Sequence, residues 1–455
     1  MIEELRPYES YRPADIPWAP TLPSAWKVRR AKTLFTRVQR PVRDADDVVT
    51  CFRDGTVTLR KNRRTTGFTE AIFEFGYQGI RRGDLVIHAM DAFAGAVGVS
   101  DSDGKGSPVY AVCAPREAAL SAYYAHVVRQ MAHSQWIAAL SRGIRQRSTD
   151  FRFDVFSVQN VPVPPPAEQA AIVRFLDHAN RRIAQFIRSK KKLIALLNER
   201  KQAIIHRAVT RGLDPNVKVK DSGVRWLGEI PGHWNVLRSK YLFREVDSRS
   251  LRGEETHLSM SQRQGLVPSS SLTERRFMSD SYAGGKLCEA GDLVLNRLKA
   301  HLGVFALAPQ AGVISPDYTV LRPIAAMAPK YFEAVYRTPA CRVVLRQKAK
   351  GIVQGFWRLY TDDFYDIAVP VPPAEEQEAI VGGLAQSLIG VQMALGHAER
   401  EIALMSEYRT RLVADVVTGQ LDVRSVAAGL PVVEPEAAAT QSEGNETDIE
   451  DGEAS

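Results

Sequence analysis

The sequence VPVPPPAEQ, from Val161 to Gln169, returns 208 residues later as VPVPPAEEQ, from Val369 to Gln377. Proline cannot donate a hydrogen bond to a sheet but is tolerated at the first turn of a helix, so each run is expected to end a strand and begin a helix. Other landmarks keep the same offset: Trp18 with Trp226, Trp26 with Trp234, Gly83-Asp84-Leu85-Val86 with Gly291-Asp292-Leu293-Val294, Ser107-Pro108 with Ser315-Pro316, and Thr210 with Thr418. The chain is therefore expected to hold two copies of one domain-sized unit, because the period is too long for a stacked solenoid repeat.

Composition is that of a soluble globular protein, with 455 residues, 45% hydrophobic and 25% charged. No run of about 18 apolar residues and no N-terminal secretion signal is evident, so neither a membrane span nor export is expected. Four scattered cysteines form neither a disulfide framework nor a CxxC metal pair. A cytoplasmic protein with reduced thiols follows from these observations.

The net charge of +8 understates how basic the body of the chain is. Residues 426–455 carry eight acids and no Lys or Arg, which leaves 60 basic against 44 acidic residues, a balance of +16, in residues 1–425. A basic body favours a polyanionic partner such as duplex DNA, and a solubilising surface charge is the alternative. The polar tail, 423–455, is expected to be acidic and disordered.

Each copy is predicted to be a mixed α/β globule followed by one long helix. Short apolar runs between Gly/Asp turns predict strands at 84–88, 108–112, 292–296 and 317–321, and one helical stretch follows them in each copy, at about 118–140 and 327–348.

Beyond each proline run the apolar residues recur every three to four positions for about 40 residues, which corresponds to a helix of roughly 60 Å. The residues predicted to form the helix–helix or partner contact are Ile172, Leu176, Ile183, Leu193, Leu197, Ile204, Ile380, Leu384, Val391, Ile402, Met405 and Leu412. A stripe this long and narrow needs a partner, so the two helices are expected to pair as an antiparallel coiled coil. Charge supports the pairing: 174–211 holds eleven basic residues and two acids, whereas 382–418 holds three basic residues and four acids.

The expected fold is α+β, with two similar α/β domains joined by two long antiparallel coiled-coil helices in a pseudo-two-fold repeat. The predicted boundaries are 1–165 for the first domain, 166–214 for the central helix, 215–372 for the second domain, 373–422 for the distal helix and 423–455 for the tail.

The sequence contains no motif of a catalytic site. No Asn or Asp precedes a Pro-Pro-aromatic sequence as an adenine methyltransferase would need, and there is no GxxxxGK[ST] phosphate loop or HExxH metal motif. Asp84 and Asp292 are nuclease carboxylate candidates by type, but an Asp in a turn that opens a strand is the commoner role. We therefore expect no enzyme activity and no metal in this chain.

The stretch from Ser222 to Trp234 resembles the linker that opens the second recognition domain of type I restriction–modification specificity subunits (HsdS). The two Pro-run-plus-Glu-Gln elements are similar to that family's junction between recognition domain and spacer helix. The segments 143–156 and 351–364 resemble its Gly-x-x-Gln segment. The resemblance spans residues 15–422.

This resemblance implies a non-catalytic subunit whose two target recognition domains each read one half of a split, asymmetric DNA site. It also implies that two DNA adenine methyltransferase subunits dock on the spacer helices and that a restriction/motor subunit joins them in phage defence. S-adenosylmethionine, ATP and Mg would then be bound by the partner subunits, with no cofactor on this chain. The alternatives are a methylation-only or regulatory complex without nuclease, and a coiled-coil protein-binding adaptor.

Residues that read DNA are expected among Arg, Lys and Gln in loops where the two copies differ. The candidates are Arg60, Lys61, Arg63, Arg64, Arg142, Arg145, Gln146 and Arg147 in the first copy, and Gln262, Arg263, Gln264, Arg275, Arg276, Lys350, Gln354 and Arg358 in the second. For each of them a solvated surface charge is the alternative reading. The half-site sequences cannot be read from the chain.

Overall fold

The computed structural model describes residues 5–63, 75–116, 119–140, 150–261, 264–272, 281–353 and 356–431. The chain divides into two compact units. Unit 1 comprises residues 1–188 together with 402–455, and unit 2 comprises residues 189–401. Each unit therefore contains one globule and a part of each of the two long helices, because the division falls within both of them.

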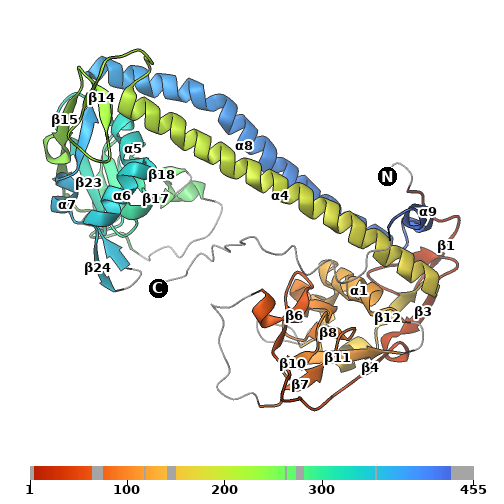
Figure 1. Ribbon diagram of the computed structural model, residues 1–455. Coiled ribbons are helices and arrows are strands. Elements are labelled where there is room, and N and C mark those ends of the chain that lie inside the picture. The colour runs from red at the N-terminus through yellow and green to blue at the C-terminus, as the bar shows by residue number, and fades with distance from the viewer. Residues whose placement is uncertain are drawn as a thin grey trace. The chain divides into compact units, whose positions relative to one another are not determined.

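The centre of unit 1 is a four-stranded antiparallel sheet in the order β4 (Phe35–Arg37), β11 (Tyr110–Pro115), β8 (Leu85–His88) and β9 (Val97–Val99) (Figure 1). Four two-stranded pairs accompany it: β1 (Tyr11–Pro13) with β2 (Thr21–Pro23), β3 (Lys27–Arg30) with β12 (Asn160–Val163), β5 (Val49–Cys51) with β6 (Val57–Leu59), and β7 (Gln78–Ile80) with β10 (Gly104–Gly106). Its short helices are α1 (Ser121–His133), α2 (Trp136–Leu140), α3 (Phe153–Ser157) and α9 (Arg424–Ala428).

Unit 2 has the same sheet order, β16 (Phe243–Val246), β23 (Tyr318–Pro323), β20 (Leu293–Asn296) and β21 (Phe305–Leu307). The pairs are β13 (Val219–Asp221) with β14 (Glu229–Pro231), β15 (Asn235–Arg238) with β26 (Ala368–Val371), β17 (Leu258–Ser261) with β18 (Gly265–Pro268), β19 (Lys286–Cys288) with β22 (Gly312–Ile314), and β24 (Lys350–Val353) with β25 (Phe356–Arg358). Its helices are α5 (Pro329–Arg337), α6 (Pro339–Lys348) and α7 (Thr361–Tyr365).

Corresponding elements of the two sheets begin 208 residues apart. Phe35, Leu85, Val97 and Tyr110 begin β4, β8, β9 and β11, and Phe243, Leu293, Phe305 and Tyr318 begin β16, β20, β21 and β23. The sequence offset therefore corresponds, strand by strand, to the same local backbone pairing in each unit.

Each globule is closed by a core of large side chains to which the long helices contribute. In unit 1, Trp26, Tyr123 and Phe156 pack in one cluster with Ile172 and Val416. In unit 2 the matching positions Trp234, Tyr331 and Phe364 share a cluster with Ile380 and Ala208. The ends of the long helices therefore belong to the two cores, and their apolar side chains are removed from water there.

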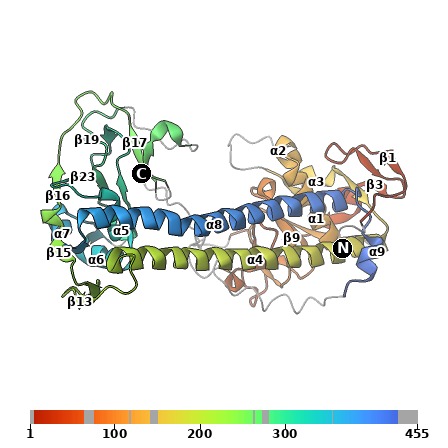
Figure 2. The same cartoon turned by 90° about the horizontal axis from the view of Figure 1, so that it is seen from above.

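The long helices are α4 (Pro166–Arg211, 46 residues) and α8 (Ala374–Val417, 44 residues). Within unit 1 they lie side by side, and Arg409 Nε donates to Asn180 Oδ1 at 3.0 Å (Figure 2). Within unit 2, Lys190 Nζ lies 2.7 Å from a Glu401 carboxylate oxygen. Inside each unit the early part of one helix therefore meets the late part of the other.

The prediction of one helical stretch within each globule, at about 118–140 and 327–348, was wrong in both copies, because each stretch forms two helices. In unit 1 the chain breaks between α1 and α2 at Gln135, which has a φ of +62°. In unit 2 Thr338 adopts an extended ψ of 145° because Pro339 follows it, and a residue before proline is excluded from the helical region. The Thr338 side chain then caps α6 by accepting a hydrogen bond from the Cys341 N–H.

Helix α8 is also the one described helix that is long and apolar enough, by length and composition, to cross a membrane. Its most apolar 18-residue window has a mean hydropathy of 1.5 and is 22% buried. The search for apolar runs in the sequence did not single it out, because Gly, Ser and Gln interrupt its apolar residues. A long helix paired with another helix passes the same test, and both ends of α8 contribute to the cores described above.

Candidate nucleic-acid interface

Each Gly-Asp-Leu-Val segment begins with a turn and leads into a strand of the central sheet, β8 in unit 1 and β20 in unit 2. Gly83 and Gly291 have φ values of +90° and +88°, in the left-handed region that favours glycine. Asp84 accepts a hydrogen bond from the Arg81 N–H at 2.8 Å, and Asp292 accepts one from the Glu289 N–H at 2.8 Å.

Each of these carboxylates is also held by an arginine. Arg40 contacts Asp84 at 2.5 and 3.1 Å, and Arg322 contacts Asp292 at 2.9 and 2.8 Å. Both aspartates therefore have structural partners, one backbone N–H in the turn and one arginine from another element, as expected for an Asp in a turn that opens a strand.

A hydrogen-bonded knot joins the start of each long helix to its globule. In unit 1, Glu168 accepts from Trp26 Nε1 at 2.8 Å and also from the Tyr8 hydroxyl. Gln169 accepts from the Leu120 N–H and donates to the Pro164 carbonyl.

Unit 2 repeats the knot with the same Trp, Glu and Gln 208 residues later, and His233 contacts the glutamate in place of Tyr8. Glu376 accepts from Trp234 Nε1 at 3.0 Å and contacts His233 Nε2 at 2.8 Å. Gln377 accepts from the Ala328 N–H and donates to the Pro372 carbonyl. The Glu-Gln pair found in the sequence is thus the fastening between globule and helix.

In unit 1 the described DNA-contact candidates are Arg60 and Lys61, in the 3₁₀ turn Arg60–Asn62 that follows the β5–β6 hairpin, and Arg63 directly after that turn. Lys61 pairs with Asp47 at 2.5 Å, and Arg63 pairs with Asp54 at 2.7 Å. The Arg63 guanidinium also lies 4.5 Å from the centre of the Phe52 ring. Arg60 points Nε toward the Thr50 hydroxyl at 3.4 Å. These cations are held in place by acids and by a ring before any ligand arrives.

In unit 2 the described candidates are Gln264, Lys350 and Arg358. Arg358 donates to Asp317 Oδ1 at 2.7 Å, and Lys350 lies 2.9 Å from Asp363. Gln264 lies in the turn after β17, where its N–H donates to the Ser261 hydroxyl at 3.3 Å. The three are carried by two different hairpins of the unit, β17–β18 and β24–β25.

Ten candidates lie outside the described residues, and nothing is said of their geometry. They are Arg64, Arg142, Arg145, Gln146, Arg147, Gln262, Arg263, Arg275, Arg276 and Gln354.

Two arginines beside these candidates were not singled out from the sequence. Arg53, in the turn of the β5–β6 hairpin, pairs with Asp91 at 2.9 Å. Arg297 donates to the Asp317 carbonyl at 2.8 Å, so Arg297 and Arg358 converge on one residue. The sequence could have identified both arginines, because at the 208-residue offset Arg53 corresponds to Ser261 and Arg297 corresponds to Ala89. A charged residue in one copy and an uncharged one in the other is the same kind of difference that identifies the other candidate DNA-reading loops.

The residues predicted for the helix contact fall into three groups in the structure. Seven are buried, namely Ile172, Leu176, Ile183, Ile380, Leu384, Val391 and Leu412. Leu197, Ile204, Ile402 and Met405 are half-buried. Leu193 is 40% exposed, in company with the neighbouring Leu196 at 52%. Apolar side chains in this stretch of α4 are thus open to solvent.

The four cysteines are buried free thiols. Burial raises the pKa of Cys51 and Cys113 to about 12, so neither is a reactive thiolate. Within the described ranges, no group of three His, Cys, Asp or Glu residues could hold a metal ion.

No family model and no curated protein matches the chain. Among solved structures, a chain from work on complex assembly and conformational transition of the type I R-M system aligns with a TM-score of 0.62. Identity is 16%, and the alignment covers 87% of this chain and 98% of that one. The chain has the fold of a type I restriction–modification component.

Two further solved chains align over similar lengths. The HsdS subunit from Thermoanaerobacter tengcongensis is 16% identical, with a TM-score of 0.45 and coverage of 88% and 98%. The type I restriction–modification S subunit from M. genitalium is 12% identical, with a TM-score of 0.35 and coverage of 90% and 97%. The alignment at a TM-score of 0.62 confirms the resemblance at the level of a fold that mixes helices and strands and contains long helices.

Proposed function

We propose that this chain is the DNA-specificity subunit of a type I restriction–modification complex. Each globule acts as a target recognition domain for one half of a bipartite, asymmetric DNA site. The recognition domains are residues 1–165 and 215–372, and the helices 166–214 and 373–422 are the spacers between them. The chain itself performs no chemistry.

The observation that carries the proposal is a repeated frame with unequal loops. The sheets, the Gly-Asp turns and the Glu-Gln knots recur at the 208-residue offset. At the hairpins, however, Arg53 stands opposite Ser261, and Arg358 stands opposite Asp150. Two readers of different half-sites need this combination, because a common frame sets the docking geometry while the differing side chains select the bases.

The two long helices serve as an antiparallel coiled coil that sets the spacing of the half-sites and docks the methyltransferase subunits. Support comes from the contacts of α4 with α8 inside each unit and from the exposed Leu193 and Leu196. Two domains that face the same side of B-DNA must contact it about one turn, roughly 34–36 Å, apart. An exposed apolar stretch between two tightly packed ends is suited to a protein partner.

The partners in this proposal are double-stranded DNA, two DNA adenine methyltransferase subunits and a restriction/motor subunit. S-adenosylmethionine, ATP and Mg belong to those subunits. The complex works in the cytoplasm of a bacterium or archaeon.

The decisive experiment is single-molecule sequencing of adenine methylation in cells that express the chain with its methyltransferase. The expected result is one split motif with two unequal halves, which disappears when the chain is deleted. Methylation that persists unchanged after the deletion would refute the proposal.

A second candidate is the specificity subunit of a methylation-only complex, which the absence of any catalytic motif in this chain leaves equally open. Neighbouring genes separate the two, because the restriction complex requires a motor-nuclease gene. A protein-binding adaptor is the third reading. Salt-dependent duplex binding by the chain together with methyltransferase would exclude it.

A further inference from the structure

Three charged residues from three segments meet at one end of the central sheet of unit 2. Arg297 follows β20, Asp317 precedes β23, and Arg358 ends β25. Strands β20 and β23 are paired at the residues next to the first two, so Arg297 and Asp317 leave the sheet at the same end. The backbone joins the third segment to them, because the Leu359 N–H donates to the Arg297 carbonyl at 3.0 Å.

Asp317 holds both arginines of this cluster. Arg358 Nη2 donates to Asp317 Oδ1 at 2.7 Å, and Arg297 Nε donates to the Asp317 carbonyl oxygen at 2.8 Å. Arg297 Nη2 also lies 3.9 Å from the same Oδ1. Two cations and one anion leave a net positive charge in the cluster. Because both guanidinium groups are oriented before a ligand arrives, less side-chain entropy is lost on binding.

The contacts within the cluster leave the outer ends of the guanidinium groups for a ligand. A guanidinium has five N–H donors and no acceptor. Arg358 Nε is buried, and Arg297 Nε is bonded to Asp317. Among the described residues, no acceptor bonds to Nη1 of either arginine. A ligand at this cluster must therefore supply hydrogen-bond acceptors.

Unit 1 has the same backbone frame without the cluster. The Phe151 N–H donates to the Ala89 carbonyl at 3.1 Å, which at the 208-residue offset is the bond that closes the unit 2 cluster. The three positions of the cluster, however, are occupied by Ala89, Val109 and Asp150. All three side chains differ while the backbone bond is kept. The cluster is therefore particular to unit 2 and is not part of the repeated frame.

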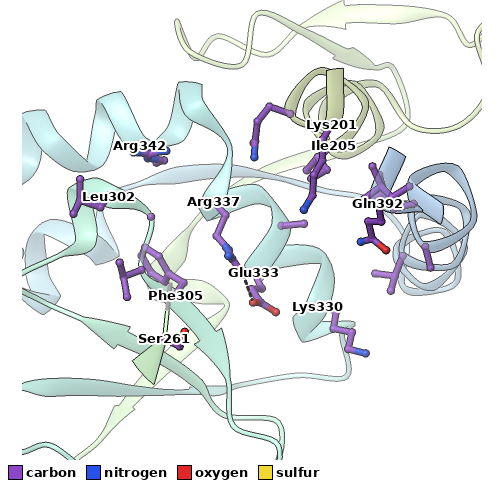
Figure 3. A pocket seen from close by; sticks show the side chains of 18 residues that line it. Lys201, Ile205, Ser261, Leu302, Phe305, Lys330, Glu333, Arg337, Arg342 and Gln392 are labelled. Carbon is purple, nitrogen blue, oxygen red and sulfur yellow. Dashed lines mark hydrogen bonds and ion pairs between the residues drawn. The ribbon is translucent and has the colours of Figure 1, made fainter. Parts of the chain in front are cut away.

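Other cations of unit 2 do belong in part to the repeated frame. Lys201 and Arg337 correspond to Arg409 and Arg129 at the 208-residue offset. They line a cavity of about 730 Å³ that is separate from the cluster (Figure 3), and its cationic lining residues are Lys201, Lys330, Arg337 and Arg342. Cations that both copies share cannot make two half-sites differ, whereas the cations of the cluster can.

The donors of the cluster match one base. Guanine presents two acceptors, N7 and O6, in the major groove, and a guanidinium can donate to both at once. Adenine and thymine each present one acceptor there, and cytosine presents a donor. Phosphate oxygens also accept hydrogen bonds, but a phosphate contact carries no sequence information. Three touching residues that differ together between the copies are the pattern expected of base selection.

We infer that Arg297 and Arg358 read guanine in the half-site of unit 2, and that Asp317 is a positioning residue that orients both guanidinium groups. The inference rests on the proposed function, in which unit 2 reads one half of a split DNA site. It adds the identity of a base in that half and two residues, Arg297 and Asp317, that the sequence did not single out.

The test uses the full chain together with its methyltransferase subunit. Methylation mapping gives the split motif of the wild-type complex and of the variants Arg297→Lys, Arg358→Lys and Asp317→Asn. Lysine keeps the positive charge but lacks the two-pronged geometry of the guanidinium, so a phosphate contact would survive this change and a guanine contact would not. The matched control is Arg342→Lys, the same change at the cavity of Figure 3.

All three variants are expected to relax the same half of the motif, at positions that are G·C pairs in the wild-type motif. The other half, and the motif of the Arg342→Lys control, should be unchanged. Asp317→Asn should act at the same positions, whereas a merely structural role of Asp317 would lower the melting temperature and leave the base preference intact. The two lysine variants decide the question even if Asp317→Asn is unstable.

A modified duplex then tests the contact with the base itself. In 7-deazaguanine the N7 acceptor is absent, while the base pair is retained. The wild-type complex is expected to bind a duplex with 7-deazaguanine at a relaxed position about tenfold more weakly, as the loss of a bidentate contact predicts. The double variant Arg297→Lys with Arg358→Lys should bind both duplexes with affinities within about twofold of each other.

Three results would overturn the inference and leave the proposed function intact. They are relaxed positions that are A·T pairs, equal weakening on all sequences, and equal wild-type affinity for the normal and the 7-deazaguanine duplex. Methylation that is unchanged when the chain is deleted would instead overturn the proposed function, and the inference with it.

Discussion

The backbone N–H of Asp422 donates to the carbonyl oxygen of Arg6 at 2.8 Å. The 208-residue offset maps both of these residues onto Asp214, in the continuous segment between α4 and β13 of unit 2. A non-covalent contact in unit 1 thus stands where unit 2 has an unbroken chain. The contact is reinforced nearby, because the Arg424 guanidinium lies 5.2 Å from the centre of the Tyr8 ring.

A circular permutant is therefore expected to fold. If a short linker joins residue 430 to residue 5 and new ends are opened within 215–218, the melting temperature should change by no more than about 1 °C, which corresponds to roughly 1 kcal/mol in a chain of this size. Differential scanning calorimetry measures the change. A permutant opened inside β20, at the centre of a sheet, is the control that should not fold. Equal loss of stability in both would contradict the expectation.

Removing the knot carboxylate of Glu376 should lower the free energy of unfolding more than removing the neighbouring carboxylate of Glu375. Glu376→Ala leaves the fully buried Trp234 without its acceptor and is expected to lower the free energy of unfolding by about 1–3 kcal/mol. Urea unfolding of the full chain measures this loss. Glu375→Ala, an exposed residue in the same first turn, is the control and should change the free energy by less than about 0.5 kcal/mol.

Acid should destabilise unit 1 through His126. The pKa of His126 in the folded chain is about 4, below the ordinary 6.5, so between these two pH values the unfolded chain binds a proton that the folded chain does not. Stability is therefore complete above pH 6.5 and declines as the pH falls toward 4, by about 2 kcal/mol between pH 7 and pH 5. Melting temperatures across this range should fall less steeply for His126→Asn than for wild type. His397→Asn, on the exposed surface of α8, should retain the wild-type slope; identical slopes for all three would refute the assignment.

Arg358→Ala should relax the DNA half-site read by unit 2 and leave the other half unchanged, at a cost of about 1–3 kcal/mol for the affected bases. Adding Gln354→Ala, at a position outside the described residues, should extend the relaxation. Methylation mapping of reconstituted variants provides the measurement. Arg238→Ala is the control, since Arg238 also pairs with an aspartate, Asp366 at 3.5 Å. Uniform weakening across all sequences would assign Arg358 to a phosphate.

The helix pair is expected to determine spacer length. Inserting one heptad in the Leu193–Ile204 stretch of α4, together with a matching heptad in α8, should lengthen the gap between the half-sites without changing either half. The same methylation mapping reads both properties. Altered half-site bases at the old spacing would show that the helices do not act as a ruler.

The frame of the fold was predictable because it depends on local signals that occur twice. The Val-Pro runs end β12 and β26 and lead into α4 and α8, as proline chemistry requires. The Gly-Asp turns likewise open β8 and β20. The breaks at Gln135 and Thr338 were missed. At Thr338 the sequence carries a signal, because Pro339 follows it. At Gln135 apolar spacing continues across the break, and only the backbone conformation interrupts the helix.

The candidate site was less predictable, because its charges are set by residues far apart in the chain. Arg358 pairs with Asp317 and Lys61 with Asp47, and no spacing rule connects such positions. Leu193 follows the same periodicity as the buried Leu176, yet is 40% exposed, because periodicity reports which side a residue faces and not what covers that side. The repeat itself is the better guide, since a comparison of the copies at every loop would also have found Arg53 and Arg297, which were missed.

The Glu-Gln knots have a consequence for inheritance. Each fastens a globule to the helix end beside it through contacts that lie wholly within one unit, with Trp26 and Glu168 in the first and Trp234 and Glu376 in the second. A genetic crossover at the proline run would exchange one globule as a cassette, and an incoming globule that carries a tryptophan at the position of Trp26 would re-form the bond to Glu168. Under the proposed function, a lineage could acquire a new recognition sequence in a single recombination event, with no period in which the protein must refold around a foreign half.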